Sequence, residues 1–389
     1  MNWPPFVHLQ GFVAPGCEPV REEVVRNLAE RGDVGAACCV YHRGVPVVDL
    51  WGGVADPATG RPWREDTLQL VFSCTKGVTA ICVLLLAERG LLDLDAPVAR
   101  YWPEFAAAGK DKIPVRWMLS HRAGLAAIDG SFTLEQALAW DPVVTALAAQ
   151  APAWEPGTRH GYHVRSYGWL LGELVRRVTG RSLGRFLADE VAAPLGLDLF
   201  IGLPASEEPR VSAIVPPDPP AGPMAEAMER LFAPDTLAGR AMTGPSNLFP
   251  YDDRWNRREL HAAELPSSNG ITTARALARL YAATIGQVDG VRLLREDTVA
   301  RACEVQSDGP DAVLYLPTRF GLGFMLPPAL APSAPPSAFG HPGAGGSLAF
   351  ADPASGIAFG YVMNRMRLDP GNDRRADALV AGVYRALAA

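Results

Sequence analysis

Apolar, β-rich runs near both ends of the chain constrain its fold more than any other sequence feature. These runs form two pairs, at residues 35–41 and 45–51 and at residues 347–351 and 356–363. Short turn-forming sequences separate the two runs of each pair, which is typical of antiparallel strands. Helices are predicted beside them at residues 20–31 and 374–387. The simplest assembly is one antiparallel sheet built from both termini and flanked by helices.

The middle of the chain, by contrast, is mainly helical. Predicted helices lie there at residues 133–147, 166–179, 183–191 and 273–284. The proline-rich stretch 204–250 has few periodic apolar positions and predicts a long loop over a surface. A chain of 389 residues is long enough for two lobes, each with its own core. We predict an α+β fold with a sheet lobe from 1–91 and 287–389 and an inserted helical lobe from 92–286.

The sequence Ser73-Cys74-Thr75-Lys76 stands at the head of an apolar run that continues to Ala87. If this run is a helix, positions i and i+3 share a face, so the Ser73 hydroxyl and the Lys76 amine come within hydrogen-bond reach. Burial among apolar side chains lowers the pKa of a lysine, and a neutral amine can take the hydroxyl proton to make a nucleophile. A structural alternative stays open at this point, in which Ser73 caps the helix and Lys76 is solvated.

Tyr162 lies in a turn-rich segment just before the predicted helix at 166–179. From this position its hydroxyl can point into a cleft between the lobes, where a phenol and an amine together can shuttle a proton. Either a tyrosinate beside a lysinium or a phenol beside a neutral lysine would serve. The alternative is an aromatic side chain that only packs in the core or at its rim.

The segment 340–347, Gly-His-Pro-Gly-Ala-Gly-Gly-Ser, predicts a glycine-rich turn that leads into a strand. Glycine lets the backbone approach a substrate closely, and a backbone N–H at this edge could supply half of an oxyanion hole. The segment lacks the Lys-Ser/Thr ending of a P-loop and the third glycine of a dinucleotide fingerprint. A tight strand entry without a catalytic part is the alternative, and His341 either orients a substrate or packs.

In order and spacing, these motifs resemble the serine β-lactamase and penicillin-binding-protein superfamily. The likeness is greatest to its class C-like branch, which includes the family VIII carboxylesterases. Supporting phrases occur at residues 118–125, 154–157 and 266–271, so that the resemblance spans most of the chain. It implies a β-lactamase/transpeptidase-like fold.

The resemblance also implies roles for individual residues. Ser73 would be the acylated nucleophile, and Lys76 and Tyr162 would transfer protons. The oxyanion hole would be formed by the backbone N–H groups of Ser73 and Ala344, because Ala344 follows His341-Pro342-Gly343 as the corresponding residue follows the K-T-G motif. Two neighbours would lie beside the substrate in the same turn: Gly343 and His341.

Two departures from the β-lactamase pattern favour esters over penicillins. Val164 stands where the tyrosine motif of β-lactamases has an asparagine, so an amide that contacts the substrate is missing. His341 replaces the lysine of K-T-G, so a permanent cation for the β-lactam carboxylate is missing as well. We predict a carboxylesterase that cleaves small esters through an acyl-enzyme. The alternatives are an acyltransferase or amide hydrolase with the same acyl-enzyme, and a penicillin-recognising sensor or weak β-lactamase.

Composition excludes several other classes of function. A net charge of −6 without basic clusters gives no footprint for nucleic acid, and no apolar stretch is long enough to cross a membrane. The segment Met1–Pro5 does not resemble a signal for secretion, so a cytoplasmic location is expected. Six cysteines lack metal-binding spacing and are expected as free thiols. We expect no metal or cofactor and a small-molecule ester as the binding partner.

Overall fold

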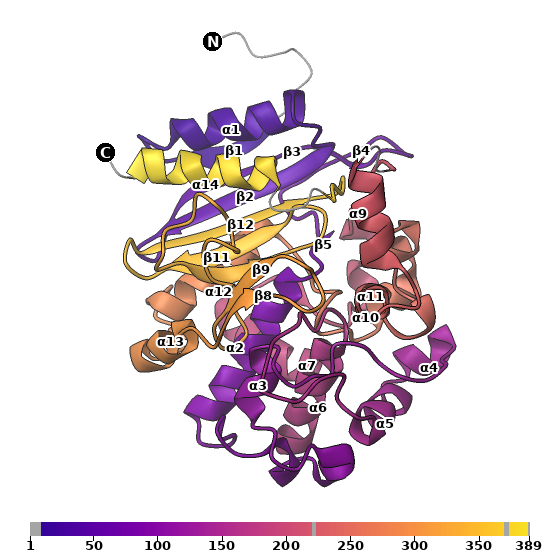
Figure 1. The fold of residues 1–389 in the computed structure, drawn as a ribbon. Helices are drawn as coiled ribbons and strands as arrows, with labels where there is room; N and C mark the ends of the chain where they lie inside the picture. Colours follow the sequence, from indigo (N-terminus) through magenta and orange to yellow (C-terminus); the bar gives the residue numbers. More distant parts are fainter. Residues whose placement is uncertain (1–8, 220–222, 369–372, 388–389) are drawn as a thin grey trace.

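The structure is a computed structural model that describes residues 9–219, 223–368 and 373–387. Its main element is a seven-stranded antiparallel sheet with the order β1-β3-β2-β12-β11-β10, in which a short strand β4 also pairs with β3 (Figure 1). The strands are β1 (Leu9–Val13), β2 (Gly35–His42), β3 (Val45–Asp56), β4 (Arg61–Pro62), β10 (Phe339–Pro342), β11 (Leu348–Asp352) and β12 (Ile357–Met363). Because β2 pairs with β12, the two ends of the chain share one sheet, as predicted.

The hairpin between β2 and β3 has the predicted turn. Arg43 has φ 51° and Gly44 has φ 81°, and two successive positive φ angles match the right-handed twist of the flanking strands. The outer strands β1 and β10 were not predicted. Glycine, histidine and proline in β10 are poor signals for a strand, and Pro342 is tolerated because it ends the strand. Residues 340–342 of the predicted turn therefore end β10 instead, and only residues 343–347 form the turn that leads into β11.

Helices cover both faces of the sheet. Helices α1 (Glu18–Ala29) and α14 (Arg374–Leu387) lie side by side on one face (Figure 1). On the other face, α12 (Ala274–Ile285) packs against β2, β11 and β12. The predicted lobe boundary at residue 286 groups α12 with the helical lobe, although this helix covers the sheet. The division into two lobes stays a prediction.

In the sequence, the remaining helices lie between strands β4 and β10. They are α2 (Cys74–Glu88), α3 (Val115–Leu119), α4 (Leu134–Leu138), α5 (Asp141–Ala149), α6 (Ser166–Thr179), α7 (Leu183–Leu187), α8 (Ala193–Leu195), α9 (Pro223–Phe232), α10 (Leu237–Thr243), α11 (Arg258–Ala262) and α13 (Glu296–Cys303). Short strands form two further sheets, β5 (Gln69–Leu70) with β7 (Ile271–Thr272) and β6 (Leu199–Phe200), and β8 (Ser307–Pro310) with β9 (Pro317–Phe320).

Three helix predictions need correction. The helix expected at 133–147 is two helices, α4 and α5, because Trp140 has φ 69° and a proline occupies the first turn of α5. In the helix expected at 183–191, the α-helical part ends at Leu187, and a π-helical turn follows at Ala188–Ala192. The stretch 204–250 is not only loop, since it contains α9 and α10. Alanine, methionine, glutamate and arginine in α9 favour a helix despite the surrounding prolines.

Helix α2 is the central helix of the core. Every residue from Cys74 to Leu86 is buried, which agrees with a sequence that is apolar on nearly all sides. Within the described ranges no helix combines the length and apolarity needed to cross a membrane. The segment Met1–Pro5, from which the cytoplasmic location is expected, lies outside the described residues.

Candidate active site

Ser73 and Lys76 meet at the start of α2. The Lys76 Nζ lies 3.1 Å from the Ser73 Oγ and 3.0 Å from the backbone oxygen of Ser267. The Ser73 side chain does not cap the helix, and Lys76 is completely buried. The contact predicted from the i, i+3 spacing is therefore confirmed, and the alternative with a capping serine and a solvated lysine is wrong.

The surroundings of Lys76 favour a neutral amine. Burial lowers its pKa well below the ordinary value, and the nearby cation of Arg165 lowers it further. A neutral amine has two N–H bonds and one lone pair. It can donate to the Ser267 carbonyl and at the same time accept the proton of the Ser73 hydroxyl. This is the arrangement that a general base for Ser73 requires.

Phe72, directly before Ser73, has a strained backbone. Its φ of 43° lies in the left-handed region, which a bulky residue rarely adopts. Edge-to-face contacts of the ring with Tyr251 at 5.3 Å and Trp255 at 5.2 Å, measured between ring centroids, fix the side chain. Backbone strain of this kind occurs where the surrounding packing over-determines a conformation, as at functional sites. Here it sets the entry of the chain into α2 and so the place of Ser73.

Tyr162 lies in the loop before α6, as predicted, and faces the same two side chains. Its ring centroid is 4.8 Å from the Lys76 Nζ, and its hydroxyl lies near the Ser73 side chain. Burial raises the pKa of this phenol well above its ordinary value, although the interaction with the Ser73 side chain opposes the shift. Of the two arrangements left open by the sequence, a phenol beside a neutral lysine fits these shifts better than a tyrosinate beside a lysinium.

His341 lies on the other side of Tyr162. Its Nδ1 is 2.7 Å from the Pro342 carbonyl oxygen, which can only accept, so the ring proton is on Nδ1. The Nε2 lone pair then faces the Tyr162 hydroxyl at 3.4 Å. Burial and the nearby Lys76 lower the pKa of His341 to about 3, so this imidazole is neutral at physiological pH. His341 packs against Tyr162 and does not supply a cation.

The glycine-rich segment forms the turn between β10 and β11. Gly343 donates its N–H to the Ser347 carbonyl at 2.6 Å, which closes the turn. A Cβ on Gly343 would collide with the Val71 carbonyl, so the turn approaches the strand before α2 closely. In the described part of the chain, the N–H groups of Ser73 and Ala344 donate to no other group. Both are free to bind a developing oxyanion.

Three residues at the site were not predicted. The Ser267 carbonyl accepts from Lys76, although the phrase at 266–271 had been noted only as part of the resemblance. Arg165 is buried, donates to the Ser268 Oγ at 2.8 Å and stacks on Tyr251 at 4.7 Å. Asp311 accepts from the Tyr162 N–H. For Arg165 the sequence held a signal, since it directly precedes the predicted helix at 166–179. For Asp311 it held none.

His160 and His163 lie close in the sequence but bind different groups. His160 bonds to the Thr318 hydroxyl at 2.9 Å, whereas His163 bonds through Nδ1 to the Gly161 carbonyl at 2.7 Å. Their rings thus serve different partners. Among the described residues there is no group of three histidine, cysteine, aspartate or glutamate side chains that could bind a metal ion. All six cysteines are free thiols, as predicted, and Cys74 donates to the His341 carbonyl at 3.2 Å.

Comparison with known proteins agrees with this geometry. The profile of the family described as Beta-lactamase matches residues 21–383, which is most of the chain. The chain belongs to the Beta-lactamase family. The resemblance drawn from the three motifs is confirmed.

Among its relatives, this Beta-lactamase family member is similar to proteins named as esterases. Esterase/beta-lactamase LipL of Mycobacterium tuberculosis (strain ATCC 25618 / H37Rv) is 39% identical over 85% of this chain and 77% of that protein. A crystal structure of a family VIII carboxylesterase has 38% identity and a TM-score of 0.88, over 97% of this chain and 100% of that one. EstA from Arthrobacter nitroguajacolicus Rue61a has 36% identity and a TM-score of 0.86, over 98% and 99%. The predicted β-lactamase/transpeptidase-like α+β fold is thereby confirmed.

Proposed function

We propose that this protein is a serine carboxylesterase that cleaves small carboxylic esters through an acyl-enzyme on Ser73. One observation carries the proposal: a buried lysine amine with a strongly lowered pKa lies 3.1 Å from the hydroxyl of a serine at a helix start. The names of the similar proteins, esterases and a carboxylesterase, support the same activity.

Acylation follows from the contacts at the site. Lys76 takes the proton of Ser73 as the Oγ attacks the ester carbonyl. The N–H groups of Ser73 and Ala344 bind the negative charge that develops on the carbonyl oxygen. As the tetrahedral intermediate collapses, Tyr162 gives its proton to the leaving alkoxide, and the lysinium of Lys76 returns a proton to the tyrosinate. The alcohol leaves and Ser73 carries the acyl group.

Deacylation repeats these steps with water as the nucleophile. Lys76 and Tyr162 together take a proton from the attacking water, and the same two N–H groups bind the oxyanion. Collapse of the second intermediate breaks the bond to the Ser73 Oγ, which recovers its proton while the carboxylic acid leaves. An alcohol or an amine in place of water would turn the same cycle into acyl transfer.

The side chains around the site favour esters over β-lactams. The neutral His341 offers no cation for a carboxylate, and Val164 is a buried apolar residue. Beside the glycine turn lies a cavity of about 630 Å³, lined largely by apolar side chains such as Leu314, Met325 and Leu348. Gly343 and Ala344 line this cavity whereas Ser73, Lys76 and Tyr162 do not, and its apolar lining suits a hydrocarbon group. A cavity of about 730 Å³ near Trp63 shares no lining residue with this one and contains none of the site residues.

We propose that the protein is located in the cytoplasm. Six free thiols suit a reducing compartment such as the cytoplasm.

Purified protein should hydrolyse p-nitrophenyl acetate and butyrate, and hydrolyse nitrocefin far more slowly. Ser73→Ala should lower ester turnover by on the order of 10³-fold or more, because the covalent nucleophile is lost. Ser307→Ala is the matched control, since it removes another buried serine hydroxyl, which donates to the Ser120 carbonyl at 2.7 Å. Wild-type turnover in Ser73→Ala would rule the proposal out. Methanol added as a competing acceptor measures acyl transfer, which shows as methyl ester among the products.

A further inference from the structure

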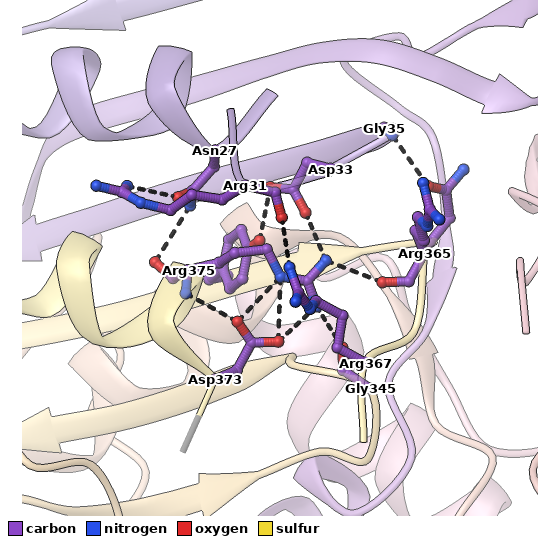
Figure 2. Close-up of polar contacts among 11 residues, drawn as sticks. Asn27, Arg31, Asp33, Gly35, Gly345, Arg365, Arg367, Asp373 and Arg375 are labelled. Atoms are coloured by element: carbon purple, nitrogen blue, oxygen red, sulfur yellow. Dashed lines mark hydrogen bonds and ion pairs between the residues drawn. The ribbon is translucent and has the colours of Figure 1, made fainter. Parts of the chain in front are cut away.

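The carbonyl of Gly345, the residue after Ala344, receives two hydrogen bonds from outside the turn. One comes from the Arg375 Nη2 at 2.6 Å, and the other from the Arg367 backbone N–H at 3.1 Å. Figure 2 shows the Arg375 guanidinium between the turn and two carboxylates, those of Asp33 and Asp373. The turn that carries the predicted oxyanion N–H is therefore tied to a buried charge.

Every N–H of the Arg375 guanidinium has an acceptor. The Nε binds both oxygens of Asp373, at 2.9 and 3.1 Å, and the Nη1 binds the Asp33 Oδ1 at 2.8 Å and the Arg365 carbonyl at 2.9 Å. The Nη2 binds Asp373 and Gly345. Arg375 is only 1% exposed, so water does not compete for these hydrogen bonds. The planar guanidinium with its five donors is therefore held rigidly, and breaking its bonds costs free energy.

The network joins parts of the chain that are far apart in sequence. Asp33 follows α1, its Oδ2 accepts from the Tyr361 hydroxyl of β12 at 2.7 Å, and Arg375 begins α14. The backbone oxygen of Arg375 also accepts from the Asn27 side chain of α1 at 3.1 Å. The guanidinium is thus fixed by the two helices and the sheet, and from there it contacts the glycine turn at the Gly345 carbonyl (Figure 2).

Gly346 shows how closely the turn and the charge cluster fit. It has φ 126°, and a Cβ placed on it would collide with the Asp373 carboxylate and lie 2.7 Å from the Arg375 Nη2. Gly345 and Gly346 both have positive φ. Because glycine has no Cβ, the backbone at these two residues can adopt many other conformations when no contact selects one. The Arg375 contact selects one of them.

We propose that Arg375 is a positioning residue for the oxyanion hole: it binds the Gly345 carbonyl and thereby holds the turn that carries the Ala344 N–H, two peptide groups earlier. This inference rests on the proposed function, in which that N–H binds the oxyanion. Without the guanidinium, the Gly345 carbonyl keeps only the Arg367 N–H, two buried carboxylates lose their ion-pair partner, and the turn is held less firmly. A displacement of about 1 Å at such a donor can lower the rate by about 10²-fold.

A purely structural role for Arg375 would lower stability and leave the oxyanion hole intact in the folded fraction. Paired substrates separate the two roles. In a thionoester, sulfur replaces the carbonyl oxygen and accepts hydrogen bonds weakly, so an enzyme that relies on oxyanion N–H donors cleaves it much more slowly than the ester. The ratio of kcat for p-nitrophenyl butyrate to kcat for its thiono analogue reports on the donors, whatever the fraction of folded protein.

Arg375→Lys keeps the positive charge but removes the fork. We expect this variant to lower the ester-to-thionoester ratio at least tenfold, with kcat for the ester falling more than KM changes. Tyr361→Phe is the control, since it removes a buried hydrogen bond from the same network without touching Gly345. It should lower stability and keep the wild-type ratio. If Arg375→Lys does not fold, Gly346→Ala displaces the turn without removing a charge, and it should lower the ratio in the same way.

A wild-type ratio in both Arg375→Lys and Gly346→Ala would overturn the inference, as would an equal fall in Tyr361→Phe. A wild-type enzyme that hydrolyses esters through Ser73 without discriminating against the thionoester would overturn both the inference and the oxyanion role of Ala344. Loss of ester hydrolysis only in Ser73→Ala, together with a wild-type ratio in the Arg375 and Gly346 variants, would leave the proposed function standing and remove the inference alone.

Discussion

The Asp311 carboxylate accepts the backbone N–H of Tyr162, at 3.0 Å from Oδ1 and 3.1 Å from Oδ2. The same carboxylate accepts from the Val313 N–H at 2.8 Å and the Thr318 hydroxyl at 3.0 Å. A buried side chain near β8 and β9 therefore fixes the loop that carries the predicted proton-transfer residue. The site depends on a contact between segments that lie far apart in the sequence.

Asp311→Asn replaces one acceptor oxygen with an amide that cannot accept, so one donor near Tyr162 loses its partner. We expect kcat for p-nitrophenyl butyrate to fall by about 10- to 100-fold, since the Tyr162 hydroxyl is displaced. The free energy of unfolding should fall by about 1 to 3 kcal/mol, the usual cost of an unsatisfied buried group. Asp308→Asn is the control, because Asp308 is half exposed and pairs with Arg319 at the surface. Equal kinetics in the two variants would contradict the positioning role of Asp311.

Tyr162→Phe removes the proton donor to the leaving group. The loss in kcat should reach about 10² to 10⁴-fold for an ethyl ester, whose alkoxide needs that proton. It should be much smaller for acylation by a p-nitrophenyl ester, whose phenolate leaves unaided. Tyr167→Phe serves for comparison, since its buried hydroxyl lies 3.4 Å from the Lys76 carbonyl and away from the reacting atoms. Equal losses for the two leaving groups in Tyr162→Phe would argue against this role.

Lys76→Met should abolish ester hydrolysis and stabilise the fold. Burial lowers the pKa of Lys76 in the folded protein, so between that pKa and the ordinary value of about 10.4 the unfolded chain binds more protons. The free energy of unfolding of the wild type therefore rises with pH across this window. Methionine has no charge to lose on burial, so the variant should be more stable than the wild type by about 1 to 2 kcal/mol at pH 7. This difference should shrink toward pH 10. Urea unfolding at both pH values measures it, and a less stable variant at pH 7 would contradict the account.

The acidic limb of the pH–rate profile should belong to Lys76, since its neutral form is the active one. Arg165 lowers the pKa of Lys76, so Arg165→Met should move this limb to higher pH. Arg240→Met, which removes an exposed arginine paired with Asp129, should leave it in place. His341→Gln should also leave the limb in place, because the pKa of His341 is about 3. A limb that disappears in His341→Gln would assign the titration to the histidine.

Local patterns in the sequence predicted the parts of the site that lie within one element. The i, i+3 spacing places Lys76 against Ser73, and Tyr162 stands at a helix entrance, as the motifs indicated. The single sheet built from both termini was likewise predicted from the strand patterns near the two ends of the chain. The antiparallel pairing of β2 with β3 and of β11 with β12 could be predicted because each pair of runs carries its own turn.

The partners of these residues come from distant segments, and no local pattern marks them. Asp311 lies 149 residues from Tyr162 in the sequence, and Arg375 lies 30 residues from Gly345, so only the folded chain shows their roles. Strand β10 was missed because its stability comes from pairing with β11 rather than from its own residues. Helix α9 was missed because the prolines around it dominated the composition of its segment.

The central claim is that Ser73 carries the acyl group, and intact-mass spectrometry tests it most directly. Acid-quenched turnover of p-nitrophenyl butyrate, and reaction with a p-nitrophenyl alkylphosphonate whose adduct water removes slowly, should each add the mass of one group. Peptide mapping should place both adducts on Ser73, and Ser73→Ala should carry neither. An adduct on another residue, or undiminished hydrolysis by a Ser73→Ala protein without any adduct, would contradict the account.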